Sequence, residues 1–283
     1  MQQNVFKILL NLTRKQPWLE DKTDELERLL FSECESEEER ELILELLERF
    51  THVTNEKFSE LINTLVEDIA TDPNLEEETT QIVAMTGDSN SDSGQFVLYA
   101  LKPGLEKFSW RKHITVNNFQ RAYKAFNTHG KKHTNIILVD EFVGSGQTII
   151  GRVKRLKDLF EGNGITNINI RVKCLAASSI GIKKAEEAEI DLTAYLVIKQ
   201  GISGHYDSTE VASKLALMDR LESILSTSYG TRNLPKLGYG GTESLYTRDS
   251  GNTPNSVFPI FWWPFFNDNS SRSPLLIRAM GDA

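Results

Sequence analysis

The sequence has very few cysteines. Its 283 residues include two, Cys34 and Cys174, which stand far apart and outside any CxxC or Cys/His spacing. This excludes a disulfide framework and a thiolate zinc site, and it favours a reducing, cytoplasmic compartment. No apolar run reaches the roughly 18 to 20 residues that span a bilayer. The first residues also lack the parts of a secretory signal, so we expect a cytoplasmic protein with no membrane segment.

Several catalytic motifs are missing too. The chain contains no HExxH zinc motif and no GxSxG nucleophile elbow. A phosphate loop of the GxxxxGK[ST] type would need a lysine where Gln147 stands. These absences argue against common hydrolases and P-loop nucleotide enzymes.

The charge is divided unevenly along the chain. Residues 1–80 contain 8 basic and 21 acidic residues, a formal charge of −13, whereas the remainder contains 24 basic and 19 acidic residues, a charge of +5. Only the second part would attract a polyphosphate, and the acidic part would repel nucleic acid. Direct nucleic-acid binding through the acidic part is therefore not expected.

The acidic part has the pattern of helices. Apolar residues of 55–72 follow one helical face, and Ser36 with Glu39 forms a capping-box pattern before another helix. An earlier helix is expected from about Leu19 to Phe31. We interpret residues 1–78 as an acidic helical unit, either a set of solvated helix faces or a docking surface for a partner protein.

After Glu78 the pattern changes to alternating strands and helices. Strands are expected at "TTQIVAM", "TNIILVD", "NINIRVKCLAAS" and "LTAYLVIK", with helices between them, including one over 114–130 and one over 147–161. This spacing predicts βαβ units and an α/β fold with a mainly parallel sheet flanked by helices. The core is expected over 79–230, followed by a loop-rich, aromatic C-terminal lid over 231–283.

The most informative stretch is "NIILVDEFVGSGQTII", residues 135–150. An apolar strand ends in two acids, and a glycine turn then opens a helix. Ligands bind at the carboxyl ends of such strands, and a helix N-terminus is a good phosphate site. Asp140 and Glu141 suit the paired hydroxyls of a ribose, so the stretch can hold a ribose and its 5′-phosphate together.

The string "IILVDEFVGSGQT" resembles the signature of type I phosphoribosyltransferases, with Glu141 in place of the commoner second aspartate. Together with "LGYGGTESLY" and "NTPNSVFPIFWW" it is similar to phosphoribosyltransferase-like domains of bacterial conflict and anti-phage defence systems. The resemblance implies a glycosyltransferase-type activity on phosphoribosyl pyrophosphate or a related nucleotide, within a defence setting.

By this resemblance, Asp140 and Glu141 hold the ribose hydroxyls and are the catalytic residues. The 5′-phosphate lies in the loop formed by Val143, Gly144, Ser145, Gly146, Gln147 and Thr148. The resemblance also implies Mg²⁺, bound through the diphosphate of the ligand, with Asp140 and Glu141 as its candidate protein ligands.

The segment "TGDSNSDSG", residues 86–94, stands where the family has its pyrophosphate loop. The candidate residues are Thr86, Gly87, Asp88 and Ser89, but the segment contains no Lys or Arg. Positive charge could instead come from Lys102, Lys107, Arg111 and Lys112 if they lie on a mobile loop, although a solvated basic loop is the simpler interpretation. Ligand binding is therefore better supported than turnover.

In the C-terminal segment, Phe261 and Trp262 are candidates for stacking on a base or acceptor. Hydrophobic packing of the segment on a core is the alternative.

Three other functions remain open. The chain could be a nucleotide-sensing module without catalysis, since fold alone does not give function. It could serve in assembly, with the acidic helices binding a partner. "DEFVGSGQT" also resembles a methyl-donor site of amino-methyltransferases, but those enzymes need a Pro-Pro-aromatic motif, and the chain has no Pro-Pro pair.

Overall fold

The computed structural model describes residues 3–87 and 92–281, and the chain divides into two compact units. One unit is continuous, Asn55–Val197, and contains the main sheet; we call it the sheet unit. The other combines Met1–Thr54 with Ile198–Ala283, and we call it the split unit. These boundaries differ from the three consecutive segments drawn from the sequence.

The sheet unit is built on five strands in the order β3-β2-β4-β5-β6. Their bounds are β2 Thr80–Ala84, β3 Ile114–Val116, β4 Asn135–Val143, β5 Asn169–Ser178 and β6 Asp191–Ile198. The pairs β2–β3, β2–β4 and β4–β5 are all parallel. The α/β fold with a mainly parallel sheet, expected from the sequence, is confirmed.

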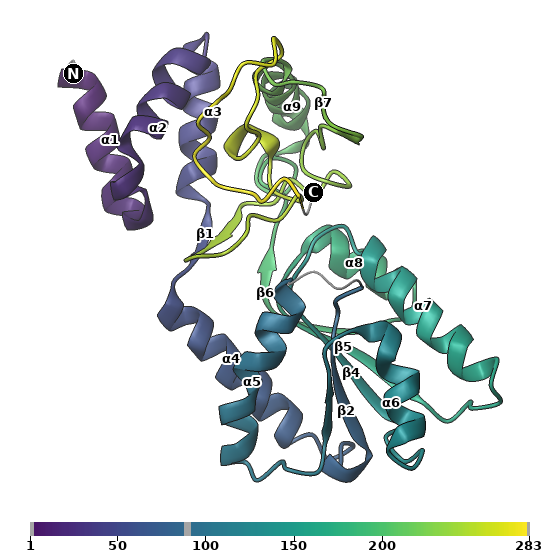
Figure 1. The fold of residues 1–283 in the computed structure, drawn as a ribbon. Coiled ribbons are helices and arrows are strands. Elements are labelled where there is room, and N and C mark those ends of the chain that lie inside the picture. Colours follow the sequence, from purple (N-terminus) through teal and green to yellow (C-terminus); the bar gives the residue numbers. More distant parts are fainter. Residues whose placement is uncertain (1–2, 88–91, 282–283) are drawn as a thin grey trace. The chain divides into compact units, whose positions relative to one another are not determined.

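Helices cover both faces of this sheet (Figure 1). Helices α4 (Asn55–Ala70) and α5 (Ser93–Lys107) lie on one face, and α6 (Ala122–Thr128), α7 (Gln147–Glu161) and α8 (Ser179–Glu187) belong to the other. The apolar strand residues are therefore buried from both sides, which explains why β4 begins as a continuous apolar run.

Buried charges fix α4 to the sheet. The Asp68 carboxylate accepts from Lys173 Nζ at 2.6 Å and from the Tyr195 hydroxyl at 2.6 Å. One turn further on, Asp72 pairs with Arg171. Lys173 is only 4% exposed, and a buried charge without its partner would be strongly unfavourable. These pairs make α4 part of the sheet unit, although its sequence resembles the acidic helices before it.

The helix expected over 114–130 is wrong in its first part. Residues Ile114–Val116 form the edge strand β3, and the short helix η4 (Phe119–Arg121) then leads into α6. All three strand residues, Ile114, Thr115 and Val116, are β-branched, which favours a strand. The Asn118 side chain accepts from the Gln120 N–H and starts the helical turn.

The split unit has a core of its own. It begins with α1 (Gln3–Lys15), η1 (Pro17–Lys22), α2 (Thr23–Arg28), the π-helical turn η2 (Leu29–Glu33) and α3 (Glu37–Glu48). The expected capping box of Ser36 and Glu39 is confirmed at the start of α3. Strand β1 (Thr51–Val53) pairs in parallel with β9 (Tyr246–Arg248). The remaining elements are η3 (Glu77–Thr79) of the sheet unit, and α9 (Ser208–Ser223), β7 (Ser228–Tyr229), β8 (Arg232–Asn233) and η5 (Pro259–Phe261) of the split unit.

Among the described residues, no helix combines the length and the apolar character needed to cross a membrane.

Candidate functional site

The direction in which successive strands are added to the sheet reverses between β2 and β4. The chain leaves β2 for β3 on one side of it, and it leaves β4 for β5 on the other side. The β2–β4 pairing ends at Ala84 and Val139, with one further hydrogen bond from Met85 N–H to Val139 O at 2.9 Å. Asp140 is the next residue. Strand order of this kind opens a crevice at the carboxyl ends of the two strands, where ligands of α/β proteins bind.

Asp140 is held in this crevice by the start of α5. Its Oδ1 accepts from the Ser93 hydroxyl at 2.7 Å and from the Glu141 N–H at 2.8 Å. Burial raises the pKa of Asp140 to about 6, and the nearby Asp92 carboxylate adds to the rise, while the Ser93 hydrogen bond and Arg152 oppose it. Both of these hydrogen bonds are accepted by Oδ1.

Glu141 lies on the same strand but is buried, with 4% of its surface exposed. Successive side chains of a strand point to opposite faces. The two acids therefore do not share one open face, and Asp140 is the better placed of the two for a ribose hydroxyl.

The loop after β4 leads directly into α7. Gly146 is the residue before the helix, with φ of +77°, a conformation that side chains disfavour. Because glycine has no side chain, the helix has no side-chain cap at this position. Gln147 and Thr148 are exposed in the first turn. Uncapped amides at a helix N-terminus bind phosphate well.

The other side of this loop is packed against the start of α8. The Ser178 hydroxyl donates to Gly144 O at 2.7 Å and accepts from Gly181 N–H at 2.9 Å. A Cβ on Gly181 would lie 2.3 Å from Gly144 O, a distance that no side chain can adopt. The loop after β4 is therefore supported by a second helix, and Gly181 is required for the close approach.

The segment after β2 reaches the same crevice. Thr86 donates to Asp92, which also accepts from Gly94 N–H at 2.9 Å, and Gln120 donates to Gly87 O at 2.8 Å. Thr86 and Gly87 thus lie near the start of α5 and beside η4, and their role in binding a diphosphate stays a prediction. The other two candidates of this loop, Asp88 and Ser89, lie outside the described residues.

Arg152 supplies a positive charge that the sequence did not reveal. It stands in the second turn of α7, its guanidinium lies 5.4 Å from the centre of the Phe119 ring, and a Cβ on Gly87 would be 3.0 Å from its Nη2. Its charge also lowers the pKa of Asp140. The guanidinium therefore lies close to Gly87 and acts electrostatically on Asp140. The one available signal was its place, one helical turn after the phosphate loop.

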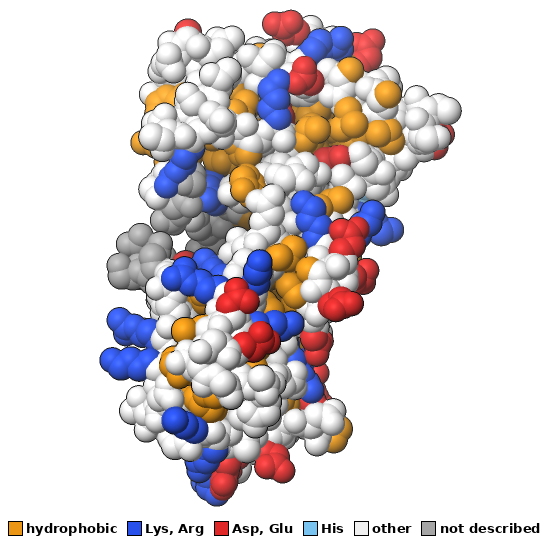
Figure 2. All heavy atoms as spheres, turned by 90° about the vertical axis from the view of Figure 1, so that its right-hand side faces the viewer, with side chains coloured by type: hydrophobic (Ala, Val, Ile, Leu, Met, Phe, Trp, Pro, Cys, Tyr) orange, Lys and Arg blue, Asp and Glu red, His pale blue; other side chains and the backbone are white. Residues whose placement is uncertain are grey.

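The wider surface of this region is basic. The residues Lys154, Arg155 and Lys157 of α7 are all exposed. Figure 2 shows Lys and Arg side chains along one edge of the sheet unit's visible face. Such a field raises the local concentration of polyanionic ligands.

The proposed mobile basic loop is wrong. Lys102 and Lys107 belong to α5, whose 15 residues separate its two ends by about 20 Å. Arg111 pairs with Glu106, and Lys112 pairs with Glu78. Asp140 meets the first residue of α5, so Lys107 and the two cations after it lie at the helix's far end.

The aromatic residues of the C-terminal segment are buried rather than open. Phe261 is 0% and Trp262 is 1% exposed, and both belong to the core of the split unit. The Trp262 indole N–H donates to Val257 O at 2.9 Å. Neither ring can stack on an acceptor here. Both rings pack in the hydrophobic core, as the alternative interpretation of the sequence has it.

Magnesium has few protein ligands available at this site. Among the residues that the structure describes, no three His, Cys, Asp or Glu side chains form a metal-binding group. Asp140 is the candidate protein ligand at this site, with both of its hydrogen bonds accepted by Oδ1. This fits a cation that arrives with a diphosphate and takes one protein oxygen, as Mg²⁺ commonly does.

The parallel sheet, the strand order that reverses at β2 and β4, and the acid at the end of β4 define the class of α/β protein to which the chain belongs. The chain belongs to the PRTase-CE family, whose model matches residues 16–278. It is thus a phosphoribosyltransferase-like protein, and the family resemblance drawn from the sequence is confirmed at this level. No curated protein matches the chain significantly.

Several solved structures are distantly similar. Xanthine-guanine-hypoxanthine phosphoribosyltransferase of Helicobacter pylori is 14% identical over 52% of this chain and 83% of that one, with a TM-score of 0.30. Orotate phosphoribosyltransferase of Aeropyrum pernix is 13% identical over 57% and 76%, with a TM-score of 0.30. A hypothetical protein of Neisseria gonorrhoeae with bound ppGpp is 13% identical over 60% and 97%, with a TM-score of 0.35.

Proposed function

We propose that this protein binds phosphoribosyl pyrophosphate, or a related ribose 5-phosphate ligand, and transfers or cleaves at its anomeric carbon. The observation that supports the proposal is the position of Asp140 at the sheet's switch point, next to the start of α5 and shortly before the glycine turn that opens α7. Ribose hydroxyls need an acceptor, the 5′-phosphate needs uncapped amides, and a diphosphate needs positive charge.

A described residue or loop can meet each of these three requirements of the ligand. Asp140 Oδ2 accepts a ribose hydroxyl, while Ser93 and the Glu141 N–H fix the carboxylate through Oδ1. The amides of Gly146–Thr148 hold the 5′-phosphate at the start of α7. Arg152 faces Gly87 and binds the diphosphate side of the ligand.

The chemistry requires loss of diphosphate from the anomeric carbon, with positive charge developing on the ribose ring. The Asp140 carboxylate lies next to that ring and stabilises the charge, and Arg152 stabilises the negative charge of the leaving group. Mg²⁺, where bound, neutralises the diphosphate further. The remaining contribution of the protein is to orient the ribose between its two loops.

We place this activity in a bacterial defence system, on the resemblance of the β4 loop and the C-terminal motif to domains of such systems. A partner protein that docks on the acidic N-terminal helices would supply or select the acceptor in that setting.

The test is calorimetry with phosphoribosyl pyrophosphate and Mg²⁺, followed by an assay of pyrophosphate release. Binding that Asp140→Asn abolishes, with release of pyrophosphate by the unaltered protein, supports the proposal. Asp158→Asn, an exposed acid on α7, is the matched control and should bind normally. Failure of the unaltered protein to bind any ribose 5-phosphate ligand would refute the ribose-phosphate function.

A second function is ligand sensing without catalysis. The absence of lysine and arginine from residues 86–94 favours it, because a leaving diphosphate there has little charge stabilisation from the loop itself. Binding that depends on Asp140 but releases no pyrophosphate, even with candidate acceptor bases added, would support sensing.

A further inference from the structure

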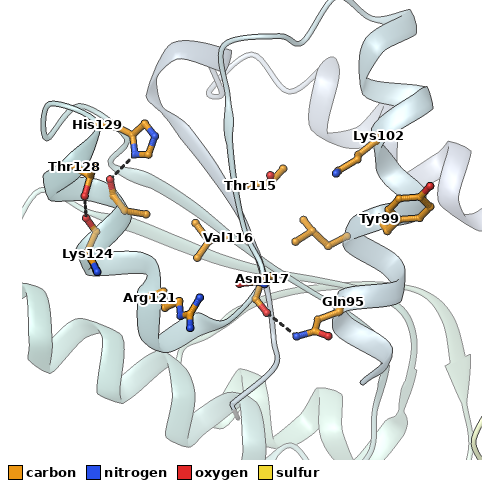
Figure 3. A pocket seen from close by; sticks show the side chains of 12 residues that line it. Gln95, Tyr99, Lys102, Thr115, Val116, Asn117, Arg121, Lys124, Thr128 and His129 are labelled. Atoms are coloured by element: carbon orange, nitrogen blue, oxygen red, sulfur yellow. Dashed lines mark hydrogen bonds between the residues drawn. The ribbon is translucent and has the colours of Figure 1, made fainter. Parts of the chain in front are cut away.

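A hollow lies on the sheet unit, at the edge strand β3. It has a volume of about 830 Å³ and is lined by α5, by β3 and by the region from η4 to α6. Its floor carries Thr115, Val116 and Asn117 (Figure 3). None of these residues belongs to the ribose-phosphate site, so the hollow is a separate feature.

Three cations surround this hollow and no acid lines it. Lys102 comes from α5, Arg121 from η4 and Lys124 from α6, and all three are exposed. Within 3–87 and 92–281, none of the three makes an ion pair with a carboxylate, although Lys102 lies 5.5 Å from the centre of the Tyr99 ring. The hollow therefore has a net positive potential, which favours an anionic occupant.

The cations stand on two sides of the strand. In Figure 3, Lys102 and Tyr99 lie along α5, whereas Arg121 and Lys124 lie across β3 on the other side. They do not converge on one point, as they would around a single phosphate group. An arrangement with charge on both sides of a strand fits an extended chain, whose successive side chains point to opposite faces.

Strand β3 also has a free edge. It pairs with β2 on one side and is the first strand of the sheet, so the described structure places no strand on its other side. The central residue, Thr115, is exposed. An exposed edge is a template for a further strand, and peptide recognition commonly uses it.

We infer that this hollow binds an extended acidic segment of a partner protein, which adds a strand at the outer edge of β3. Its backbone would pair with the β3 edge, and its acidic side chains would alternate between Lys102 on one face and Arg121 and Lys124 on the other. The inference is independent of the ribose-phosphate function, because it uses none of the residues of that site.

The test uses a short fluorescein-labelled peptide that contains valines and pairs of adjacent glutamates. Its affinity for the full chain is measured by fluorescence anisotropy at low salt. Each of Lys102→Glu and Lys124→Glu should weaken binding about three- to tenfold, since a reversed charge repels the glutamates. Lys157→Glu, an exposed lysine on α7, is the matched control and should leave the affinity unchanged. Amide hydrogen exchange at 114–116 should slow when the peptide binds.

Two further ligands decide between explanations. A peptide with alternate N-methylated amides keeps its charge but cannot form a ladder, so it should lose binding. Equal binding of the methylated peptide would overturn strand addition and leave charge attraction alone. Tighter binding of inorganic triphosphate at the same two lysines, or no binding of the unmethylated peptide at about 1 mM, would also overturn the inference.

Discussion

At the residue scale, the charged form of Asp140 destabilises the folded protein. Its carboxylate is desolvated and lies near Asp92, so its pKa is raised to about 6. A folded-state pKa above the unfolded value means that the folded protein binds the proton more tightly. The contribution of Asp140 to stability therefore falls as the pH rises from about 4 to about 6, and the penalty is complete above that range. A ligand hydroxyl or cation would relieve it.

The first prediction concerns Asp140→Asn. The amide removes the buried charge, so the free energy of unfolding at pH 7.5 should rise by about 1–3 kcal/mol. The gain should shrink towards pH 4, where Asp140 is protonated. Thermal melts of both proteins between pH 4 and pH 8 measure the difference. A variant that is less stable than the unaltered protein at pH 7.5 would show that the buried charge of Asp140 does not destabilise the fold.

The second prediction concerns Arg152→Ala. Its guanidinium faces Gly87, so the variant should bind phosphoribosyl pyrophosphate about 10- to 100-fold more weakly, the range of a lost charge-assisted hydrogen bond. Binding of ribose 5-phosphate should change much less, because that ligand has no diphosphate. Calorimetry with the two ligands makes the comparison, and Arg155→Ala on the same helix is the control. An equal loss for both ligands would place Arg152 elsewhere in the mechanism.

At the scale of elements, the phosphate loop depends on the packing of α8 behind it. Gly181 allows Gly144 O to approach closely, whereas Gly151 in α7 has open space around its missing Cβ. Two glycines in neighbouring helices thus have opposite roles. One is required by contact, and the other only weakens its helix.

This contrast gives the third prediction. Gly181→Ala should destabilise the protein by about 1–3 kcal/mol through overpacking, and it should weaken phosphate binding because the loop must move. Gly151→Ala should stabilise the protein by about 0.5–1 kcal/mol. Chemical denaturation of the two variants provides the free energies. Unchanged stability in Gly181→Ala would mean that the loop and α8 separate easily.

Much of this scale could be predicted from sequence. Helix α7 and strand β4 follow from a long apolar pattern and a glycine turn, and the loop between them from its motif. Strand β3 could not be predicted, because three residues are too few to show the alternation of a strand. The helical pattern of the residues after it also continues into the strand when it is traced towards the N-terminus. Arg152 was missed because nothing in a sequence shows that a helix side chain reaches over to Gly87. Phe261 and Trp262 were ambiguous for a related reason, since composition cannot tell a core aromatic from a ligand-stacking one.

At the scale of the whole molecule, the split unit joins the two ends of the chain. The Arg272 guanidinium forms a buried pair with Glu33, with Nη2 to Oε2 at 2.7 Å, and it also donates to the carbonyls of Trp263 and Ile260. Arg272 is 6% exposed. The N-terminal helices therefore depend on residues more than two hundred positions later.

The fourth prediction follows from this pair. Arg272→Met leaves Glu33 buried without a partner, which should cost about 3–5 kcal/mol. The double variant with Glu33→Met should recover part of the loss, because no buried charge remains. Lys15→Ala, which breaks the exposed pair with Glu48, should cost less than about 1 kcal/mol. Similar losses for the buried and the exposed pair would show that the Arg272 contact contributes little.

The split unit consists of two segments that are far apart in the sequence, so its two parts are synthesised at different times. Ribosomes add about 5–20 residues per second, so Leu26, Leu42 and Leu46 emerge roughly 10–50 s before the residues with which they share a core, Phe258, Trp262 and Leu275. The sheet unit is continuous and can complete its own sheet during that interval. The apolar residues of the nascent N-terminal helices therefore lack part of their core until synthesis is nearly finished. A chain that ended before Phe258 would leave the N-terminal helices without the C-terminal part of their shared core.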